Sequence, residues 1–499
     1  MNRHILTTVA IAGSFALSGC FSSDSDDSAS PDQVEGQIVV PVGTADGDDD
    51  NGAILNQMAG HPAALRPTAG GTILNASANC PDVPGGYEAL ADATVEFLDS
   101  SDVVVGDTVT TDECGQFNAD PPSEAVMVRA TRDGFHPVEA EVANFRAGGS
   151  GIGSTIPSNW NYRIGSMQVQ SDGRVAFTVV DDQRGMAVIG LPARTVEALV
   201  NQTQVSIGDL TSSAATQEAA SVGVVLDASG SMYQWAYTDE DTGESFDRFQ
   251  LTTLATHEFL NIRGGGDEVS FTIFDGRVDL INDDWIEANW TLEDAQQDPV
   301  DYSFSSSGFT QDEEPLRMIS DAFNPHSTIW GANQDADTIA DDPHAETPDF
   351  QITNSYSWGG MTALYDAVDA GLDVLETAAN DRKILVTMGD GGDNSSTKNK
   401  QEVIDRANSM GIPVLAVGLA VSGTAEQNLK DLGYDTGGDY FSVDSIDISD
   451  AFISIQSGIQ FQYLLELPGV DLEAGDVLTL RIDYNNIVAE RDYTVPSNP

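Results

Sequence analysis

The stretch VGVVLDASGS, residues 222–231, decides the fold of the central part of the chain. Its first five residues contain no polar side chain, which is typical of a strand buried on both faces, as in a parallel sheet. Asp227, Ser229 and Ser231 follow at the point where such a strand ends. Ligands of open α/β sheets bind beyond the carboxyl ends of the strands. The stretch therefore predicts a buried strand that ends in a polar, ligand-facing loop.

Three more apolar runs follow along the chain, at Val269–Phe274, Ile384–Met388 and Val414–Leu419. Amphipathic segments alternate with these runs. Residues on one face recur at helical spacing in two of them: Leu251, Leu254, Ala255 and Phe259 in the first, and Leu364, Ala367, Val368 and Leu372 in the second. Alternating strands and helices predict an α/β fold with a doubly wound parallel sheet.

Four further motifs follow the DxSxS pattern of 227–231. They are GDEVSF at 266–271, GGMTALYDA at 359–367, DGGDN at 390–394 and GGDYF at 437–441. In this order the five motifs resemble von Willebrand factor A (VWA) domains that carry a metal-ion-dependent adhesion site. The resemblance implies a VWA domain at 221–462 with an insertion at about 283–358. Two positions depart from the family pattern: Met361 is an extra residue, and Gly389 stands where the family often has Thr.

The resemblance also implies a divalent-cation site whose residues come from three loops: Asp227, Ser229, Ser231, Thr362 and Asp390. Mg²⁺ is the expected ion, with Mn²⁺ or Ca²⁺ as alternatives. Hydroxyl oxygens bind the ion directly in such a site, and the carboxylates act mainly through bound water. Because few ligands are anionic, the ion stays electrophilic, and a carboxylate from a protein partner completes its shell. The alternative is a degenerate domain whose loops no longer bind metal.

Five of the six tryptophans lie between residues 235 and 358. Trp235 closely follows the DxSxS loop, and Trp358 directly precedes the GGMT loop, which suggests an aromatic rim that selects the partner. The alternative is that the tryptophans build a small core for the insertion. No HExxH or GxSxG pattern occurs, and an SxxK match at 395–398 lacks companion motifs. We therefore do not expect an enzyme.

The first twenty residues, MNRHILTTVAIAGSFALSGC, have a basic start and a short apolar run. Their end, Leu-Ser-Gly-Cys, resembles the lipobox of bacterial lipoproteins. The resemblance implies a signal peptide at 1–19 and lipidation of Cys20, and Phe21 favours the outer membrane of a Gram-negative bacterium. The alternative is a secretory signal with a chance cysteine. Residues 20–66 are rich in Ser, Asp and Gly and predict an acidic flexible tether.

Short alternating strands fill 67–146, where TDECGQF and RDGF resemble the carboxypeptidase regulatory-like β-sandwich. Cys80 and Cys114 are the remaining cysteines, and we expect a disulfide between them in an oxidising compartment. The segments 155–220 and 463–499 also read as strands. Each is too small for a core of its own, so we expect them to pair with each other around the inserted VWA domain.

The chain of 499 residues has 21 Lys and Arg against 80 Asp and Glu, a formal net charge of −59. Nucleic acid and anionic lipid surfaces would repel such a protein, so membrane contact is expected through the lipid anchor only. The charge favours a marine or halophilic extracytoplasmic setting, although an ordinary acidic secreted protein fits as well.

Together the patterns predict an outer-membrane lipoprotein, facing the periplasm or the surface, that binds a protein partner through a divalent cation. Two alternatives stay open. One is a metal-independent scaffold subunit of an envelope complex, and the other is a hydrolase located in the insertion.

Overall fold

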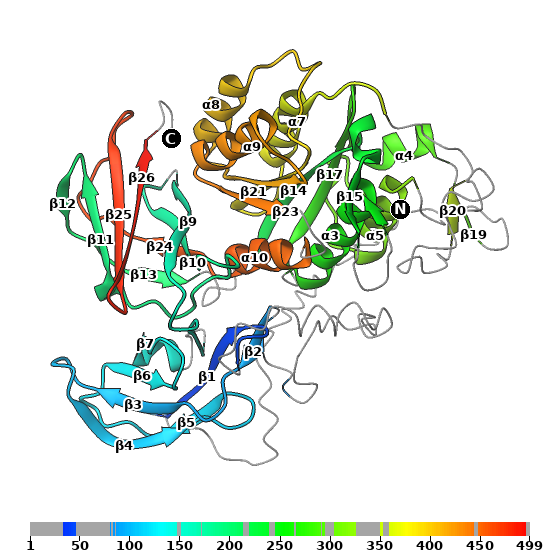
Figure 1. Cartoon of the computed structure of the whole chain (residues 1–499). Coiled ribbons are helices and arrows are strands. Elements are labelled where there is room, and N and C mark those ends of the chain that lie inside the picture. Colours follow the sequence, from blue (N-terminus) through cyan, green and yellow to red (C-terminus); the bar gives the residue numbers. More distant parts are fainter. Residues whose placement is uncertain are drawn as a thin grey trace, which may run out of the picture.

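The computed structural model describes residues 33–45, 80, 83–84, 86–146, 151–170, 172–212, 219–238, 245–263, 266–290, 292–294, 304–325, 350–352, 359–443 and 448–495. An α/β unit occupies the middle of the chain, and strands from both sides of it form two further units (Figure 1).

The central unit is built on a six-stranded sheet. Its strands in spatial order are β18 (Val278–Ile281), β17 (Glu268–Phe274), β14 (Ala220–Asp227), β21 (Arg382–Gly389), β22 (Val414–Leu419) and β23 (Asp439–Val443). All neighbours are parallel except β17 and β18. β14 lies at the switch point, because β17 pairs on one side of it and β21 on the other. The predicted parallel sheet is present.

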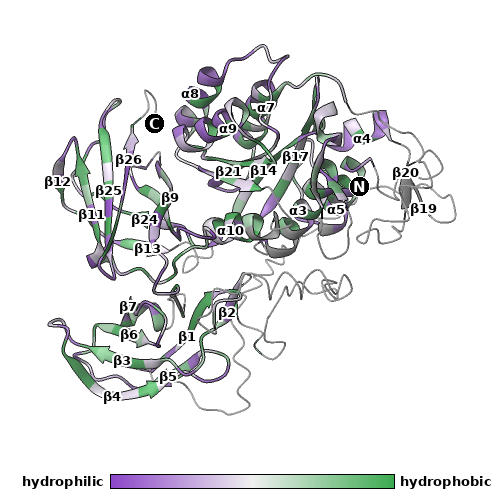
Figure 2. Ribbon diagram, in the orientation of Figure 1, coloured by the Kyte–Doolittle hydropathy of each residue, from purple (hydrophilic) through white to green (hydrophobic). Residues whose placement is uncertain are grey.

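Helices cover both faces of this sheet (Figure 1). On one face lie α3 (Arg248–Ile262), α5 (Glu313–Phe323) and α10 (Ile448–Gln460). On the other lie α7 (Leu364–Glu376), α8 (Lys400–Met410) and α9 (Thr424–Asp435). Val224 points into the first core and Val225 into the second, because side chains alternate along a strand. Figure 2 shows hydrophobic residues along β14, β17 and β21 between the two layers of helices.

Part of the predicted insertion belongs to the core. The described portion contains α4 (Asp283–Asn289), β19 (Leu292–Asp294), β20 (Phe350–Ile352) and α5. β19 pairs with β20, and α5 packs on α3. The rings of Trp285 and Trp290 meet edge to face at 4.9 Å, and Trp290 is buried in the core beside α5. These two tryptophans therefore serve packing, which was the alternative to a partner-binding role.

The flanking segments 155–220 and 463–499 pair as expected. Their strands are β9 (Tyr162–Val169), β10 (Val175–Asp181), β11 (Val196–Val200), β12 (Thr203–Val205), β13 (Leu210–Ser212), β24 (Tyr463–Leu465), β25 (Val477–Tyr484) and β26 (Ile487–Thr494). β24 joins β10 and β13 in one four-stranded sheet, and β25 joins β11 in another. Side chains from both sheets share one hydrophobic cluster. The α/β unit is inserted between β13 and β24.

The N-terminal strands form two more four-stranded sheets around one core. One contains β1 (Val34–Pro41), β2 (Tyr87–Ala89), β5 (Gln116–Ala119) and β8 (Ile152–Ser154), and the other β3 (Thr94–Leu98), β4 (Val104–Thr110), β6 (Met127–Thr131) and β7 (Val138–Glu141). Cys80 and Cys114 form a disulfide with a Cα–Cα distance of 5.3 Å.

Two predictions about this N-terminal part are wrong. Residues 20–66 are not a flexible tether throughout, because β1 lies inside them and its side chains at Val34, Ile38 and Val40 are fully buried. The boundaries 67–146 are too narrow, because they leave out β1, which pairs with β2, β5 and β8, and they also leave out β8. Eight residues with an apolar run suffice for a strand even within a polar stretch.

The signal peptide 1–19 and Cys20 lie outside the described residues. Within the part of the chain that the structure describes, no helix is long and apolar enough to cross a membrane.

The α/β unit is fixed to the flanking sheets at the start of β23. Arg163 Nη1 on β9 donates to Asp439 Oδ2 at 2.7 Å, and the Asp439 side chain is buried. The amide of Met167 donates to the carbonyl of Gly437 at 2.7 Å. Gly437 has a φ of +76°, and a Cβ there would lie 2.3 Å from the Met167 carbonyl oxygen, so only glycine permits this approach.

Candidate metal centre

Asp227 is the last residue of β14 and is 1% exposed. The strand ends beside β17, where the amide of Ala228 donates to the carbonyl of Phe274 at 2.7 Å. Because β14 is the switch-point strand, the carboxyl ends of β17 and β21 lie on its two sides. The Asp227 carboxylate therefore lies between the loops that follow β17 and β21.

The two serines of the first loop lie next to each other. Ser229 Oγ and Ser231 Oγ are 2.9 Å apart, and the Ser229 amide donates to Asp227 Oδ1 at 2.8 Å. A short 3₁₀ turn at Gly230–Tyr233 brings the second hydroxyl back beside the first. Two hydroxyl oxygens and a carboxylate thus share one small region, as binding of a hard cation requires.

The loop that carries Thr362 lies against the first loop. A Cβ built on Gly230 would lie 3.7 Å from the amide nitrogen of Gly360. Thr362 is 5% exposed; its amide donates to Asn394 Oδ1 at 2.8 Å, and its carbonyl accepts from the Asn394 amide at 2.9 Å. The extra residue Met361 is 55% exposed. Met361 therefore faces solvent, while Asn394 anchors Thr362 to the DGGDN loop.

Asp390 follows β21 directly and brings the third loop to the site. Its Oδ1 accepts from the Gly392 amide at 3.1 Å, and its Oδ2 accepts from Arg248 Nη1 at 3.1 Å. Arg248 could not be predicted from the sequence, because the residue lies 142 positions from its partner Asp390. The available signal is a basic residue at the start of a predicted helix close to acidic loops. Because this pattern is common, it does not single out Arg248.

Burial raises the pKa of Asp227 to about 7, and the nearby negative charge of Asp390 adds to the rise. Hydrogen bonds from Ser229 act in the opposite direction. Two carboxylates held this close without a cation repel each other. A divalent cation would relieve that repulsion, which makes the pair a favourable place for one.

Cation binding is therefore expected to depend on pH. A proton on Asp227 competes with the cation, so with a pKa of about 7 the apparent Mg²⁺ affinity should fall about thirtyfold between pH 8 and pH 5.5. Without a cation, the free energy of unfolding falls as the pH rises. The raised pKa of Asp227 stabilises the fold below about pH 4, and this contribution is lost as the pH rises through 7. Calorimetric titrations at both pH values check the first effect, and an unchanged affinity would contradict it.

Gly389, the second departure from the family pattern, is explained by its neighbour. A Cβ at Gly389 would lie 2.7 Å from Asp227 Cβ and 2.8 Å from Asp227 Oδ2. The side chain of Asp227 thus occupies the space that a larger residue would need.

Gly389→Ala should therefore displace Asp227, weaken Mg²⁺ binding about tenfold and destabilise the fold by about 1–3 kcal/mol. Gly458→Ala in α10 is the matched control, because the nearest atom to its Cβ is 3.9 Å away. Chemical denaturation and Mg²⁺ titration of both variants check this expectation. Equal behaviour of the two variants would show that Gly389 has no such role.

The donor set fits a hard divalent cation. It consists of three hydroxyls and two carboxylates, all oxygen atoms, which Mg²⁺ and Ca²⁺ prefer. Among the described residues, no cluster of three or more His, Cys, Asp or Glu could hold a metal ion. Any cation held by these loops would thus depend on hydroxyl ligands and would keep part of its positive charge for a further anion.

Of the two tryptophans expected at the rim, Trp235 begins β15 (Trp235–Thr238), which pairs with β16 (Ser245–Asp247). It is 63% exposed, and its Nε1 donates to Thr238 Oγ1 at 2.9 Å. Trp358 lies outside the described residues. Tyr233, which sequence reasoning missed, is 48% exposed beside the first loop. With Met361 these residues give the site large exposed apolar side chains.

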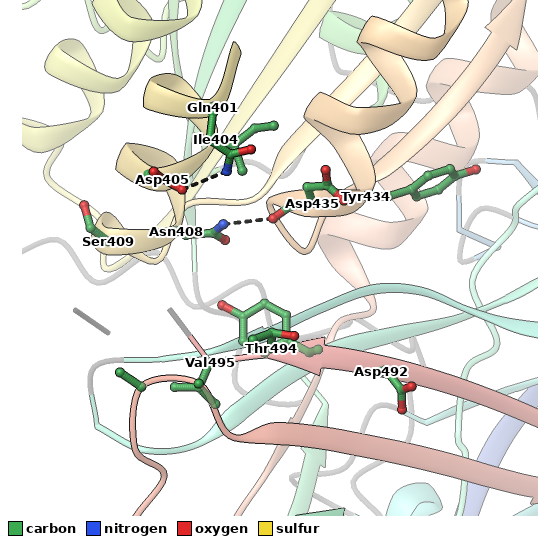
Figure 3. Close-up of a pocket in the computed structure, with 13 residues that line it drawn as sticks. Gln401, Ile404, Asp405, Asn408, Ser409, Tyr434, Asp435, Asp492, Thr494 and Val495 are labelled. Carbon is green, nitrogen blue, oxygen red and sulfur yellow. Dashed lines mark hydrogen bonds between the residues drawn. The ribbon is translucent and has the colours of Figure 1, made fainter. Parts of the chain in front are cut away.

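A groove of about 810 Å³ lies apart from the metal loops, between α8, the end of α9 and β26 (Figure 3). Asn408 Nδ2 donates to the carbonyl of Asp435 at 2.8 Å, and Gln401 Nε2 donates to Asp405 Oδ1 at 2.9 Å. Its lining contains no histidine, cysteine or lysine. None of its lining residues lies in the insertion at 283–358, so the groove does not bear on the hydrolase alternative placed there.

No known family profile matches the chain, and no curated protein matches it. Solved structures do align with it. BatB, a conserved hypothetical protein from Bacteroides thetaiotaomicron, is 16% identical, with 48% of this chain and 98% of that chain covered and a TM-score of 0.29.

A von Willebrand factor type A structure from Catenulispora acidiphila is 10% identical, with 68% and 74% covered and a TM-score of 0.31. The vWF domain of the type V pili tip protein Mfa5 from Porphyromonas gingivalis is 11% identical, with 48% and 95% covered and a TM-score of 0.28. These similarities are too low to assign a function to this chain.

Proposed function

We propose that the chain is a VWA-containing lipoprotein of the cell envelope that binds a protein partner through a divalent cation. The observation that carries the proposal is the meeting of three loops at the switch point of the central sheet. There Ser229 is hydrogen-bonded to Asp227 and to Ser231. The charge of Asp390 acts on Asp227, and Thr362 is anchored by Asn394 in the adjoining loop.

The hydroxyls of Ser229, Ser231 and Thr362 would hold the cation directly, and Asp227 and Asp390 would orient its bound water. Mg²⁺ is the favoured ion because the donors are oxygen atoms on short, well-anchored side chains; Mn²⁺ and Ca²⁺ are the alternatives. When bound, the cation supplies an electrophilic position that a partner's carboxylate can occupy. Few negatively charged groups of the chain itself would bind the cation directly. The partner's carboxylate would then supply the negative charge that the site lacks.

The exposed side chains around the loops would then select the partner. Tyr233, Trp235 and Met361 are exposed apolar residues within or next to the metal loops in sequence. Trp and Tyr are enriched among residues that dominate binding energy. We infer that the partner presents an acidic residue flanked by apolar ones. Lipidation at Cys20 would attach the protein to the outer membrane, facing the periplasm or the surface, and the net charge of −59 disfavours nucleic acid as a ligand.

The test is a pull-down from envelope extracts with immobilised protein, in Mg²⁺ and in EDTA. A specific partner should be retained in Mg²⁺ only, Asp227→Ala should lose it, and Trp235→Ala should weaken it at least tenfold while Mg²⁺ binding stays unchanged. Val488→Ala on β26 is the matched control, since Val488 is 50% exposed but belongs to the flanking sheet. Retention that survives EDTA and Asp227→Ala would favour a metal-independent scaffold subunit.

A further inference from the structure

Arg248 is a basic residue that contacts two of the candidate metal loops. It is the first residue of α3, directly after the N-cap Asp247, whose side chain forms a capping box with Gln250. Its side chain is 11% exposed and that of its partner Asp390 is 12% exposed. The capped helix start therefore fixes a largely buried positive charge beside the proposed cation position.

The guanidinium of Arg248 donates hydrogen bonds to three acceptors. Nη1 donates to Asp390 Oδ2 at 3.1 Å and to the carbonyl of Ser231 at 3.2 Å, and Nη2 donates to the carbonyl of Ala420 at 2.9 Å. One contact is thus made to a candidate cation-orienting carboxylate and another to the backbone of a candidate ligand. A lysine could not make these contacts together, because they need the planar fork of an arginine.

We propose that Arg248 is an internal counter-ion that competes with the divalent cation for Asp390 and thereby makes cation binding depend on the partner's carboxylate. The proposal rests on the proposed function above and adds a residue that controls it. Like charges in a poorly solvated region repel strongly, so a fixed positive charge weakens binding of a second cation. A partner's carboxylate supplies the negative charge that lets both cations coexist.

Two consequences distinguish this role from simple positioning. Removal of the charge should strengthen Mg²⁺ binding, although it deletes three hydrogen bonds. It should also reduce the benefit that an added carboxylate gives to Mg²⁺ binding, because the site then has one positive charge fewer to neutralise. A residue that merely orders the loops would produce the opposite first result, since its loss would weaken the binding.

The experiment is calorimetric titration of the full protein with MgCl₂ at pH 8, alone and with sodium acetate as the carboxylate probe. Arg248→Gln is expected to bind Mg²⁺ about tenfold more tightly than the wild type, whereas Arg248→Lys, which keeps the charge, should stay within about threefold of the wild type. Acetate should tighten Mg²⁺ binding by the wild type more than by Arg248→Gln. If the glutamine variant does not fold, Arg248→Met takes its place as a neutral variant.

Arg406→Gln is the matched control. Arg406 pairs with Asp369 at 2.7 Å and also with Asp373, on α7 and away from the metal loops, so its loss removes the same charge without touching the site. Unchanged affinity there, with tighter binding in Arg248→Gln, supports the proposal. Equal or weaker binding in Arg248→Gln overturns it. If the wild type itself shows no saturable Mg²⁺ site, the proposed function fails and not only the role of Arg248.

Discussion

Asp227→Ala is expected to abolish the saturable Mg²⁺ site, with affinity weakened about a hundredfold or more. The substitution removes one of two carboxylates and the acceptor of the Ser229 amide, so both the charge and the loop geometry are lost. Loss of groups that act on a metal through its bound ligands typically costs ten- to a hundredfold in affinity. Calorimetric titration at pH 8 measures the change.

The same variant should be more stable than the wild type when no divalent cation is present. The raised pKa of Asp227 means that its ionised form is unfavourable in the folded state, so removing it relieves a cost above pH 7. Asp275→Ala is the control. Asp275 directly follows β17, the strand beside β14, but it pairs with Arg277 and is no candidate ligand. A Mg²⁺ affinity reduced equally by both substitutions would contradict a specific role for Asp227.

Asp439→Ala is expected to destabilise the protein by about 2–3 kcal/mol. The Asp439 side chain is 5% exposed, and its carboxylate accepts from Arg163 at 2.7 Å and from the Tyr440 amide at 2.9 Å. Truncation leaves Arg163 without this partner at the contact between the α/β unit and β9. Arg163 keeps partial access to water, which places the loss below that of a fully buried pair. Urea unfolding followed by fluorescence measures it.

Asp172→Ala provides the comparison for an exposed ion pair. Asp172 contacts Arg174 at 2.6 Å, but both side chains are more than one third exposed, so its loss should cost less than about 0.5 kcal/mol. If the two substitutions had equal effects, the contact at Asp439 would not hold the α/β unit against the flanking sheets.

The parts that the sequence predicts well are those written in local patterns. The apolar run before Asp227 and the runs at β17, β21 and β22 define strands by themselves, and the order of strands and helices then limits the topology. Two of the three metal loops are short motifs at the ends of strands β14 and β21, and the third directly precedes α7. The switch point brings the loops of β14 and β21 together without any further information, so Asp227 and Asp390 could be placed side by side.

The features that the sequence did not predict depend on distant partners. β1 looks like part of a polar tether, because its neighbours in sequence are polar and its strand partners lie between residues 87 and 154. Arg248 carries no local sign of its contact with Asp390. The need for glycine at 389 is visible only when Asp227 is seen beside it. Such relations arise from packing, which composition and periodicity do not encode.

The most direct test of the central claim is anomalous diffraction from crystals of the protein grown with Mn²⁺ as a substitute for Mg²⁺. We predict a strong anomalous peak among the three loops, within about 2.0–2.3 Å of the hydroxyl oxygens of Ser229, Ser231 and Thr362. Peaks confined to acidic surface residues, with none at these hydroxyls in a protein saturated with Mn²⁺, would contradict a cation-dependent binding site.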